Sequence, residues 1–246
     1  MSIASSTIDS DEIKRFSQLA EEWWNPHGKF ALLHRLNPLR VGYIRDVLCH
    51  RYGRCLSLPE PLKGIRILDI GCGGGLISQP LTRLGAEVIG IDPEIHTITI
   101  ARTSASNVGL NIDYRVSTVE EIATTNEKVD VVIAMEVIEH VTDTTMFWKG
   151  VSDVTKPGGV IVIGTLNRTI KALALAVIGA EYILRWLPPR SHDWKRFVKP
   201  SELSVALRSQ GCKLDQLTGV VYRPTGFRLD PYDLSINYMA IASKID

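Results

Sequence analysis

Short apolar runs of strand length alternate with stretches of helical character along most of this chain. Such runs lie near residues 65–70, 87–91, 111–116, 128–134, 159–165, 213–222 and 236–242. Strands that alternate with helices form parallel sheets with helices on both faces. The pattern therefore predicts an α/β fold with a doubly wound, seven-stranded, mostly parallel sheet, in a single domain over residues 1–246.

Two segments fall outside this alternation. Residues 10–60 form an N-terminal helical extension, in which Ser10 is expected to cap a helix that buries Phe16, Leu19, Ala20 and Trp23. A turn is expected at Asn25-Pro26-His27-Gly28, and a second helix is expected to begin at Asn37-Pro38. Residues 166–200 form a helical insertion between the fifth strand and the last pair of strands.

Composition narrows the range of partners and compartments. The 246 residues are 45% apolar, enough for a substantial core, and 28 basic against 27 acidic residues leave a net charge of +1. Such a balance gives no sign of a nucleic-acid partner. The four cysteines form no C-x-x-C pair, no signal-peptide or presequence pattern opens the chain, and no apolar run reaches transmembrane length. We expect a cytoplasmic protein with reduced thiols.

Residues 65–75 combine an apolar strand with a glycine-rich loop. The loop has the pattern D-x-G-x-G-x-G, formed by Asp69, Gly71, Gly73 and Gly75. Glycines let backbone N–H groups approach a ligand closely, and the helix that follows presents its positive end to the same ligand. Asp92, seventeen residues after Gly75, ends the next strand, where an acid can accept both hydroxyls of a ribose. Together these features favour a nucleotide-type cofactor over an ordinary tight turn.

The spacing of the glycines distinguishes between two cofactor classes. A dinucleotide fingerprint, G-x-G-x-x-G, would need a glycine where Leu76 stands, which disfavours a nucleotide-dependent oxidoreductase. The D-x-G-x-G-x-G loop is instead similar to the first motif of Rossmann-like S-adenosylmethionine (SAM) methyltransferases. In those enzymes the loop holds the methionyl part of the cofactor and a later acid takes the ribose.

Several further stretches carry a closer resemblance. They are residues 33–40 (Leu-His-Arg-Leu-Asn-Pro-Leu-Arg), 135–140 (Met-Glu-Val-Ile-Glu-His), 156–159 (Lys-Pro-Gly-Gly), 165–168 (Thr-Leu-Asn-Arg) and 179–185 (Gly-Ala-Glu-Tyr-Ile-Leu-Arg). Through them the chain resembles the ubiquinone-biosynthesis O-methyltransferases over residues 10–243. The resemblance implies SAM-dependent methylation of both catechol-type hydroxyls of polyprenyl precursors of ubiquinone. It also implies cofactor contacts at Arg40, Gly71, Asp92 and Met135.

The residue types at these positions suit those contacts. The guanidinium of Arg40 can bind the carboxylate of the cofactor with two parallel hydrogen bonds, although a cation on a helix surface would serve as well without a ligand. Met135 ends the fourth strand, where its thioether can pack on an adenine or simply fill the core.

Transfer of a methyl group to a phenol requires the phenol to ionise. A phenol with a pKa near 10 costs roughly 4 kcal/mol to ionise at pH 7. Glu136, Glu139 and His140 follow the fourth strand and are the candidates for this step. They could bind Mg²⁺, Mn²⁺ or Zn²⁺, and the resemblance points to Mg²⁺. Alternatively, no metal is needed: His140 is a general base or a wall of the site, and the glutamates are acids that favour the start of a helix. Of the three, His140 and Glu136 are the predicted catalytic residues.

Two other classes of protein are compatible with a SAM-binding loop. A nucleic-acid methyltransferase would carry an Asp-Pro-Pro-Tyr-like motif after the fourth strand, where Glu136-Val137-Ile138-Glu139 stands instead. A non-catalytic scaffold that works beside other ubiquinone-biosynthesis enzymes is disfavoured by the intact loop and Asp92.

The insertion combines features of an interfacial membrane segment. Residues 172–187 are mostly apolar and include Trp186, Trp194 follows, and cations flank the run at Arg168, Lys171, Arg185, Arg190, Lys195, Arg196 and Lys199. Such a segment suits peripheral binding to the anionic inner face of a bacterial membrane, where a polyprenyl substrate resides. The alternative is a lid helix with Glu181 and Arg185 as an ion pair.

Overall fold

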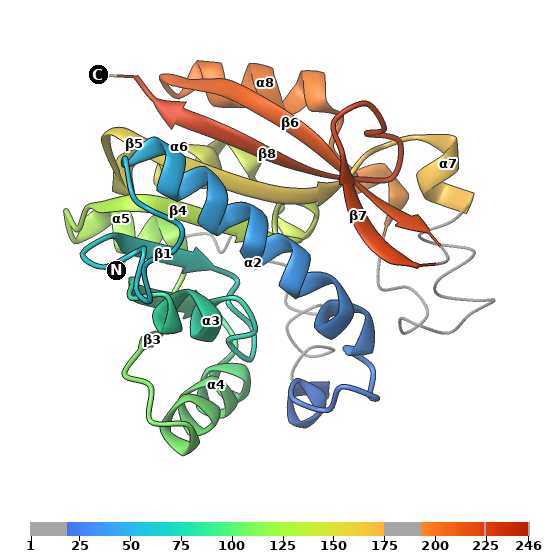
Figure 1. Ribbon diagram of the computed structural model, residues 1–246. Coiled ribbons are helices and arrows are strands. Elements are labelled where there is room, and N and C mark those ends of the chain that lie inside the picture. Colours follow the sequence, from blue (N-terminus) through green and yellow to red (C-terminus); the bar gives the residue numbers. More distant parts are fainter. Residues whose placement is uncertain (1–18, 175–192, 224, 246) are drawn as a thin grey trace, which may run out of the picture.

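The computed structural model describes residues 19–174, 193–223 and 225–245. Within them, eight strands form one mixed sheet in the order β3-β2-β1-β4-β5-β8-β6-β7 (Figure 1). β1 to β5 run parallel, β8 is antiparallel to β5 and β6, and β7 is antiparallel to β6. The strands are β1 (Arg66–Ile70), β2 (Glu87–Asp92), β3 (Asp113–Val116), β4 (Val129–Met135), β5 (Thr155–Leu166), β6 (Cys212–Arg223), β7 (Gly226–Asp230) and β8 (Asn237–Lys244).

The predicted fold class is confirmed, and each of the seven predicted runs is a strand. The structure adds an eighth strand, β7, which the sequence pattern did not show. β7 has five residues, lies at the edge of the sheet and returns along β6 from the pair Arg223 and Gly226 to the pair Gly219 and Asp230. Because most of its residues are only half-buried, it has no apolar run that would mark it in the sequence.

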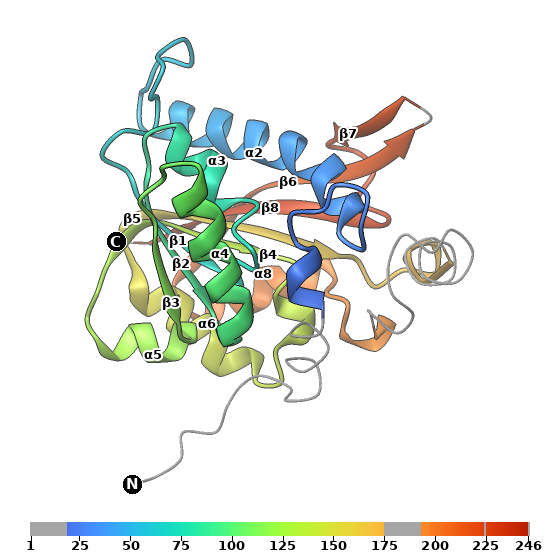
Figure 2. The same cartoon turned by 90° about the horizontal axis from the view of Figure 1, so that it is seen from below.

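Helices cover both faces of the sheet (Figure 1, Figure 2). Ile133 of β4 lies in one core cluster with Ile44 of α2 (Ala31–Arg51), while its neighbour Val132 lies in another with Phe147 of α6 (Thr144–Val154). Because both faces are covered, the central strands are apolar on both sides. One face carries α2 (Ala31–Arg51), α3 (Ser78–Arg83) and α4 (Ile95–Asn107), and the other carries α5 (Val119–Thr124), α6 (Thr144–Val154) and α8 (Pro200–Ser209).

The N-terminal extension differs from its prediction in one respect. Helix α2 begins at Ala31, so Pro38 lies inside it rather than at its start. A proline within a helix removes one backbone hydrogen bond, but the ring of Pro38 is exposed, and burial of Leu36, Val41 and Ile44 outweighs that loss. The predicted turn is present, since the N–H of Gly28 donates to the carbonyl of Asn25 at 3.0 Å.

Only parts of the other two predicted segments are described. Ala20 and Trp23 are buried as expected, within and just after the 3₁₀ helix η1 (Ala20–Glu22), whereas Ser10 and Phe16 lie outside the described residues. The insertion is described at its two ends, in α7 (Ile170–Ala172) and the 3₁₀ helix η4 (Trp194–Arg196). Residues 175–192, which include most of the predicted apolar run at 172–187, lie outside them. No helix in the described parts of the chain is long and apolar enough to cross a membrane.

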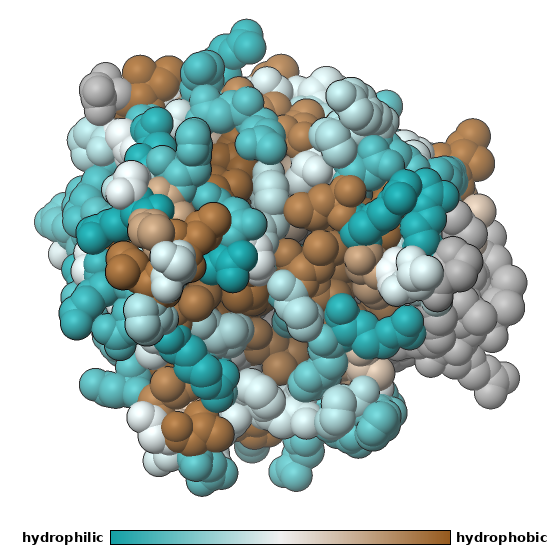
Figure 3. All heavy atoms as spheres, viewed as in Figure 1, coloured by the Kyte–Doolittle hydropathy of each residue, from teal (hydrophilic) through white to brown (hydrophobic). Residues whose placement is uncertain are grey.

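The face covered by α2 shows apolar patches broken by hydrophilic side chains (Figure 3). A pocket of about 340 Å³ borders α2 at Tyr43 and Val47 and the sheet at Val160 and Ile241. Val160 lies several residues before the carboxyl end of β5 at Leu166, so this pocket is set back from the sheet edge at which ligands bind in α/β folds.

Candidate active site

Several predicted site residues meet at the carboxyl edge of the sheet, where open α/β sheets bind ligands. The parallel strands β1, β2, β4 and β5 end at this edge. Strand β8 begins there because it is antiparallel to β5 and Asn237 pairs with Leu166, the last residue of β5. The glycine loop, Asp92, Glu136 and Asn237 therefore come from four strands but share one edge.

The glycine loop after β1 has a shape that only glycine supports. Gly71 and Gly73 have φ angles of +62° and +53°, in the left-handed region. A Cβ on Gly71 would lie 2.6 Å from Cγ2 of Val137, and one on Gly73 would lie 2.5 Å from Cη2 of Trp23. The loop is therefore closely packed between the turn after β4 and the N-terminal extension. We call residues 71–75 of this loop the glycine cradle.

The N-terminal extension is anchored to this loop by its two tryptophans. The indole N–H of Trp24 donates to the carbonyl of Gly74 at 2.9 Å. Trp23 stacks on Phe30, with ring centroids 3.9 Å apart, and its buried indole N–H has no partner among the described residues. Sequence reasoning treated Trp23 only as core, and it missed Trp24 altogether. The adjacent pair of tryptophans just before the first turn was the available signal.

Two aspartates support the loop in different ways. Asp69 is 2% exposed and accepts a hydrogen bond from the hydroxyl of Ser78 at 2.5 Å, which ties the end of β1 to the start of α3. Burial raises the pKa of Asp69 to about 7. Asp69 therefore holds the cradle in shape, and no contact of its own with a ligand is needed to explain its position.

Asp92 links the cradle to the end of β2. One carboxylate oxygen accepts the N–H of Gly73 at 3.2 Å and the other accepts the N–H of Glu94 at 3.0 Å. Burial raises the pKa of Asp92 to about 6, against the opposing effect of these two hydrogen bonds. Each oxygen keeps a lone pair, so a pair of hydroxyls on a ligand can still bind.

Arg40 enters the same edge from α2. Its side chain is 1% exposed and donates to Oε1 of Glu136. The side-chain amide of Asn237 donates to the same oxygen at 2.9 Å. Nε of Arg40 and Oδ1 of Asn237 are buried without a partner among the described residues. A surface position for Arg40 is thereby excluded, and the guanidinium retains a free donor for a planar anion.

Glu136, which lies between Arg40 and Asn237, has a rare backbone conformation. Its φ angle is +56°, a conformation that L-residues other than glycine rarely adopt and that costs on the order of 1–2 kcal/mol. Its N–H donates to the carbonyl of Gly164 at 2.8 Å, which fixes the turn from β4 into the 3₁₀ helix η2 (Ile138–His140). Backbone strain of this kind is characteristic of functional sites.

Glu139 and His140 lie in η2, just after Glu136. Glu139 is 3% exposed and accepts the hydroxyl of Thr165 at 3.0 Å, and burial next to Glu136 raises its pKa well above the usual range. His140 is half-buried at the end of the turn. Among the described residues, no three His, Cys, Asp or Glu side chains gather so that they could hold a metal ion, and Mg²⁺ at Glu136, Glu139 and His140 stays a prediction.

Met135 packs within the core at the end of β4. It is 9% exposed, and a Cβ on Gly164 of β5 would lie 2.5 Å from its sulfur. Its contact with an adenine stays a prediction. Sequence reasoning also missed Thr165 and Asn237, because the apolar pattern of the last strand shows neither its direction nor its pairing with β5.

Comparisons with known proteins agree with this geometry. The family model for a methyltransferase domain matches residues 68–163. The ubiquinone biosynthesis O-methyltransferase of Chelativorans sp. (strain BNC1) is 49% identical over 97% of this chain and 95% of its own length. The enzyme of the same name from Brucella anthropi is 47% identical over 98% of both chains. The chain belongs to the ubiquinone biosynthesis O-methyltransferase family. The family predicted from residues 33–40, 69–75, 135–140 and 179–185 is therefore confirmed.

Solved structures confirm the fold of this family member. The magnesium protoporphyrin IX methyltransferase of Synechocystis PCC 6803 with bound SAM has a TM-score of 0.63 at 15% identity, covering 99% of this chain and 100% of that one. A SAM-dependent methyltransferase from Clostridium acetobutylicum has a TM-score of 0.64 at 10% identity, covering 95% and 99%. Both show the Rossmann-like methyltransferase fold.

The residues at the carboxyl edge fit SAM. The loop presents backbone with no Cβ in the way, Asp92 retains acceptor capacity on both oxygens, and the buried Arg40 retains an unpartnered donor. These are the groups required by a ribose and by the carboxylate of an amino acid.

Proposed function

We propose that this chain is a SAM-dependent O-methyltransferase that methylates phenolic hydroxyls of polyprenyl, catechol-type intermediates, in both O-methylation steps of ubiquinone biosynthesis. Relatives of that name match it over nearly their full length. The observation that carries the proposal within the structure is the meeting of the glycine cradle, Asp92 and the Arg40–Glu136 pair at one edge. A cofactor site and a carboxylate that can accept a proton are thereby brought together.

Each proposed cofactor contact has a physical role. Arg40 binds the carboxylate of the amino-acid part, Asp92 accepts both ribose hydroxyls, Gly71 and Gly73 offer their backbone, and Met135 lies near the adenine. Asp69 keeps the loop in place through Ser78. When bound, SAM supplies a methyl group on a sulfonium, and the C–S bond breaks as the phenolate oxygen attacks, leaving S-adenosylhomocysteine (SAH).

Glu136 is the proposed acceptor of the phenol proton, with His140 as the second candidate. Ionising the phenol costs roughly 4 kcal/mol at pH 7, so a positioned base is needed. Glu139 cannot serve in this way while burial favours its protonated form. Its role is to support the turn through Thr165. Aligning the oxygen behind the methyl group is the remaining task of the site.

The decisive experiment is methyl transfer from labelled SAM to a short-chain demethylubiquinol. Wild-type protein should label the product, and His140→Ala and Glu136→Gln should each slow the reaction. An enzyme that binds NAD tightly and SAM not at all would contradict the proposal. Repeating the assay in excess EDTA tests Mg²⁺ separately: full activity supports direct activation by the side chains, whereas loss of activity that added Mg²⁺ restores supports the metal.

We further propose that the protein is cytoplasmic and binds the anionic inner face of the membrane through residues 166–200, close to its polyprenyl substrate and to other enzymes of ubiquinone biosynthesis. At the described ends of this segment, Lys195 and Lys199 are exposed, whereas Arg168 pairs with Glu202 and Lys171 with Asp233. Each unpaired cation near an anionic membrane surface contributes about 1 kcal/mol to binding.

Binding to liposomes tests this proposal. Wild-type protein should co-sediment with anionic liposomes at low salt and less with neutral ones. Failure to do so would mean that the segment is an ordinary lid.

A further inference from the structure

Two roles in the proposed function depend on the same side chain of Arg40. As a cofactor ligand, Arg40 must bind a carboxylate, yet its guanidinium already donates to the carboxylate of Glu136. As a base, Glu136 must take a proton from the phenol, yet its carboxylate is held by the buried guanidinium of Arg40. While the pair is intact, Glu136 and the carboxylate of a cofactor compete for the guanidinium of Arg40.

We propose that the carboxylate of the cofactor displaces Glu136 from Arg40, so that cofactor binding releases Glu136 to act on the phenol while Asn237 holds it in place. The inference rests on the proposed function. It adds an internal competitor, Glu136, and a positioning residue, Asn237, to the site.

The geometry supports an exchange at Arg40. The guanidinium is 1% exposed, so it cannot turn to solvent when Glu136 leaves and has to keep an anionic partner. The side chain of Glu136 is 20% exposed and can move toward the open edge. The amide of Asn237, at the start of β8, donates to the same oxygen of Glu136 at 2.9 Å. Glu136 therefore keeps its hydrogen bond from Asn237 after Arg40 is taken.

Buried polar atoms without a partner near Arg40 indicate which groups of this site would bind the amino-acid part of the cofactor. Nε of Arg40 and Oδ1 of Asn37 are buried on α2, and neither has a partner among the described residues. An amino-acid group carries both a carboxylate and an ammonium, which match a donor and an acceptor respectively. These two atoms, three residues apart on one helix, could receive such a group, whereas Nη2 of Arg40 donates to Glu136.

The test compares two ligands on wild-type protein and on Glu136→Gln by isothermal titration calorimetry. SAH carries the carboxylate, whereas 5′-methylthioadenosine keeps the adenosine and the sulfur but has no carboxylate. Glutamine keeps the shape but makes only a neutral hydrogen bond to Arg40, so SAH should bind on the order of fivefold more tightly to the variant. Methylthioadenosine should bind equally to both proteins. Glu60→Gln, in an exposed loop, is the matched control and should change neither affinity.

Each result of this titration has a clear meaning. Tighter SAH with unchanged methylthioadenosine supports the exchange. Unchanged or weaker SAH, or equal changes for both ligands, overturns it while leaving the cofactor assignment intact. Wild-type protein that binds no SAH overturns the proposed function itself. If Glu136→Gln unfolds, Glu136→Gly serves instead, because it removes the carboxylate and also relieves the φ angle of +56°.

Asn237 is tested by separating turnover from binding. Asn237→Ala should lower kcat about tenfold or more, because the released Glu136 is no longer held. KM for the phenol and SAH affinity should stay within about twofold. Asn237→Thr, which restores a donor on a strand-favouring side chain, should recover part of kcat. Loss of SAH binding in parallel with kcat, or no loss of kcat, would show that Asn237 only supports the fold.

Discussion

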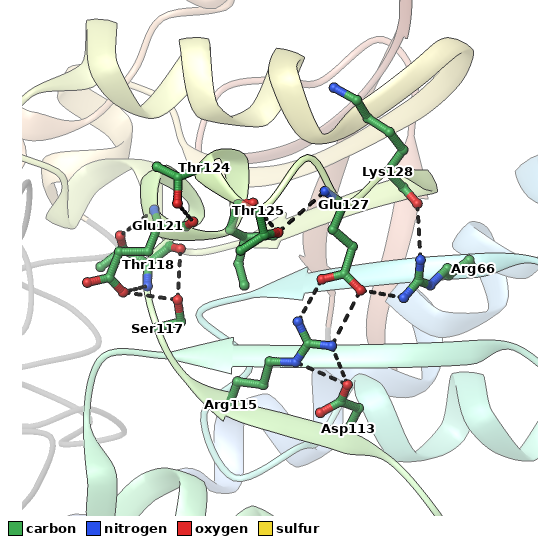
Figure 4. A network of polar contacts seen from close by, with 11 residues as sticks. Arg66, Asp113, Arg115, Ser117, Thr118, Glu121, Thr124, Thr125, Glu127 and Lys128 are labelled. Carbon is green, nitrogen blue, oxygen red and sulfur yellow. Dashed lines mark hydrogen bonds and ion pairs between the residues drawn. The ribbon is translucent and has the colours of Figure 1, made fainter.

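Two arginines that each pair with a glutamate illustrate how differently two regions of this molecule handle charge. Arg115 of β3 donates to Glu127 at 2.6 Å and to Asp113, and Arg66 of β1 also donates to Glu127 (Figure 4). None of these four side chains leaves a buried polar atom unpartnered among the described residues. The hydrogen bonds from Arg115 lower the pKa of Glu127, and the cluster joins β1, β3 and the approach to β4.

Arg40 and Glu136 make the same kind of pair at the carboxyl edge, but with incomplete partners. Arg40 is buried, whereas Arg115 is about a third exposed, at 33%. Around Arg40 and Glu136, buried atoms of Arg40, Asn37, Glu139 and Asn237 have no partner among the described residues. Buried polar atoms without a partner lower the free energy of unfolding, and a ligand that supplies partners at the carboxyl edge would raise it again. The cluster around Glu127 serves the fold, and the pair at Glu136 serves the ligand.

The largest expected effect separates the two glutamates by turnover. Glu136→Gln should lower kcat by about 10²–10⁴, the range for loss of a general base, while Glu127→Gln should leave kcat near the wild-type value. Steady-state methyl transfer at saturating SAM measures both. Equal effects of the two substitutions would remove the functional contrast between the regions.

The next effect concerns the cofactor and two aspartates. Asp92→Ala removes two charged hydrogen bonds to the ribose and should weaken SAH by roughly 2–4 kcal/mol. Asp113→Ala, which removes a partner of Arg115, should leave SAH affinity unchanged. Calorimetry on both variants provides the comparison. A normal SAH affinity in Asp92→Ala would mean that this carboxylate only braces Gly73 and Glu94.

The success of sequence reasoning differs between the fold and the site for physical reasons. Covered on both faces, β1, β2, β4 and β5 are largely apolar runs, so these strands and the loop after β1 were predictable from the pattern. β7 was missed because a half-exposed edge strand has no such run. Pro38 misplaced the start of α2, because tertiary packing outweighed a local helix-breaking signal.

At the site, sequence identified residue types but not their pairings. Glu136, Glu139 and His140 looked equivalent in the sequence, whereas the structure separates an ion-paired Glu136 from a buried Glu139 bonded to Thr165. Asn237 lies 101 residues from Glu136, and only the antiparallel return of β8 brings it there. Contacts that depend on strand direction are not encoded in a local pattern.

Stability should separate the two glutamates in the same direction as turnover. Glu127→Gln replaces charge-assisted hydrogen bonds with neutral ones in a partly exposed cluster, which should lower the free energy of unfolding by about 1–2 kcal/mol. A chain of this size should then lose a few degrees of Tm. Glu136→Gln should lower the free energy of unfolding by more, because it leaves the buried guanidinium of Arg40 without an anionic partner. Denaturant titration without ligand measures both, and a smaller loss in Glu136→Gln would contradict the contrast between the two pairs.

The smallest effect is a pH dependence that only the carboxyl edge should show. Burial raises the pKa of Asp92 to about 6 in the free protein, so the carboxylate takes up a proton as the pH falls through that value. A protonated carboxyl accepts the ribose hydroxyls poorly, and SAH therefore binds the ionised form. Affinity should accordingly fall about fourfold between pH 7 and pH 5.5, with proton release on binding near pH 6.

Calorimetry in buffers of different ionisation enthalpy detects this proton directly. Asp92→Asn should bind SAH more weakly and lose the pH dependence in this range, whereas Asp113→Asn should retain the wild-type profile. Affinity that rises on acidification would reverse the sign and show that the ribose is bound by the protonated acid. A flat profile in the wild-type protein would show that the two backbone hydrogen bonds from Gly73 and Glu94 outweigh the burial of this carboxylate.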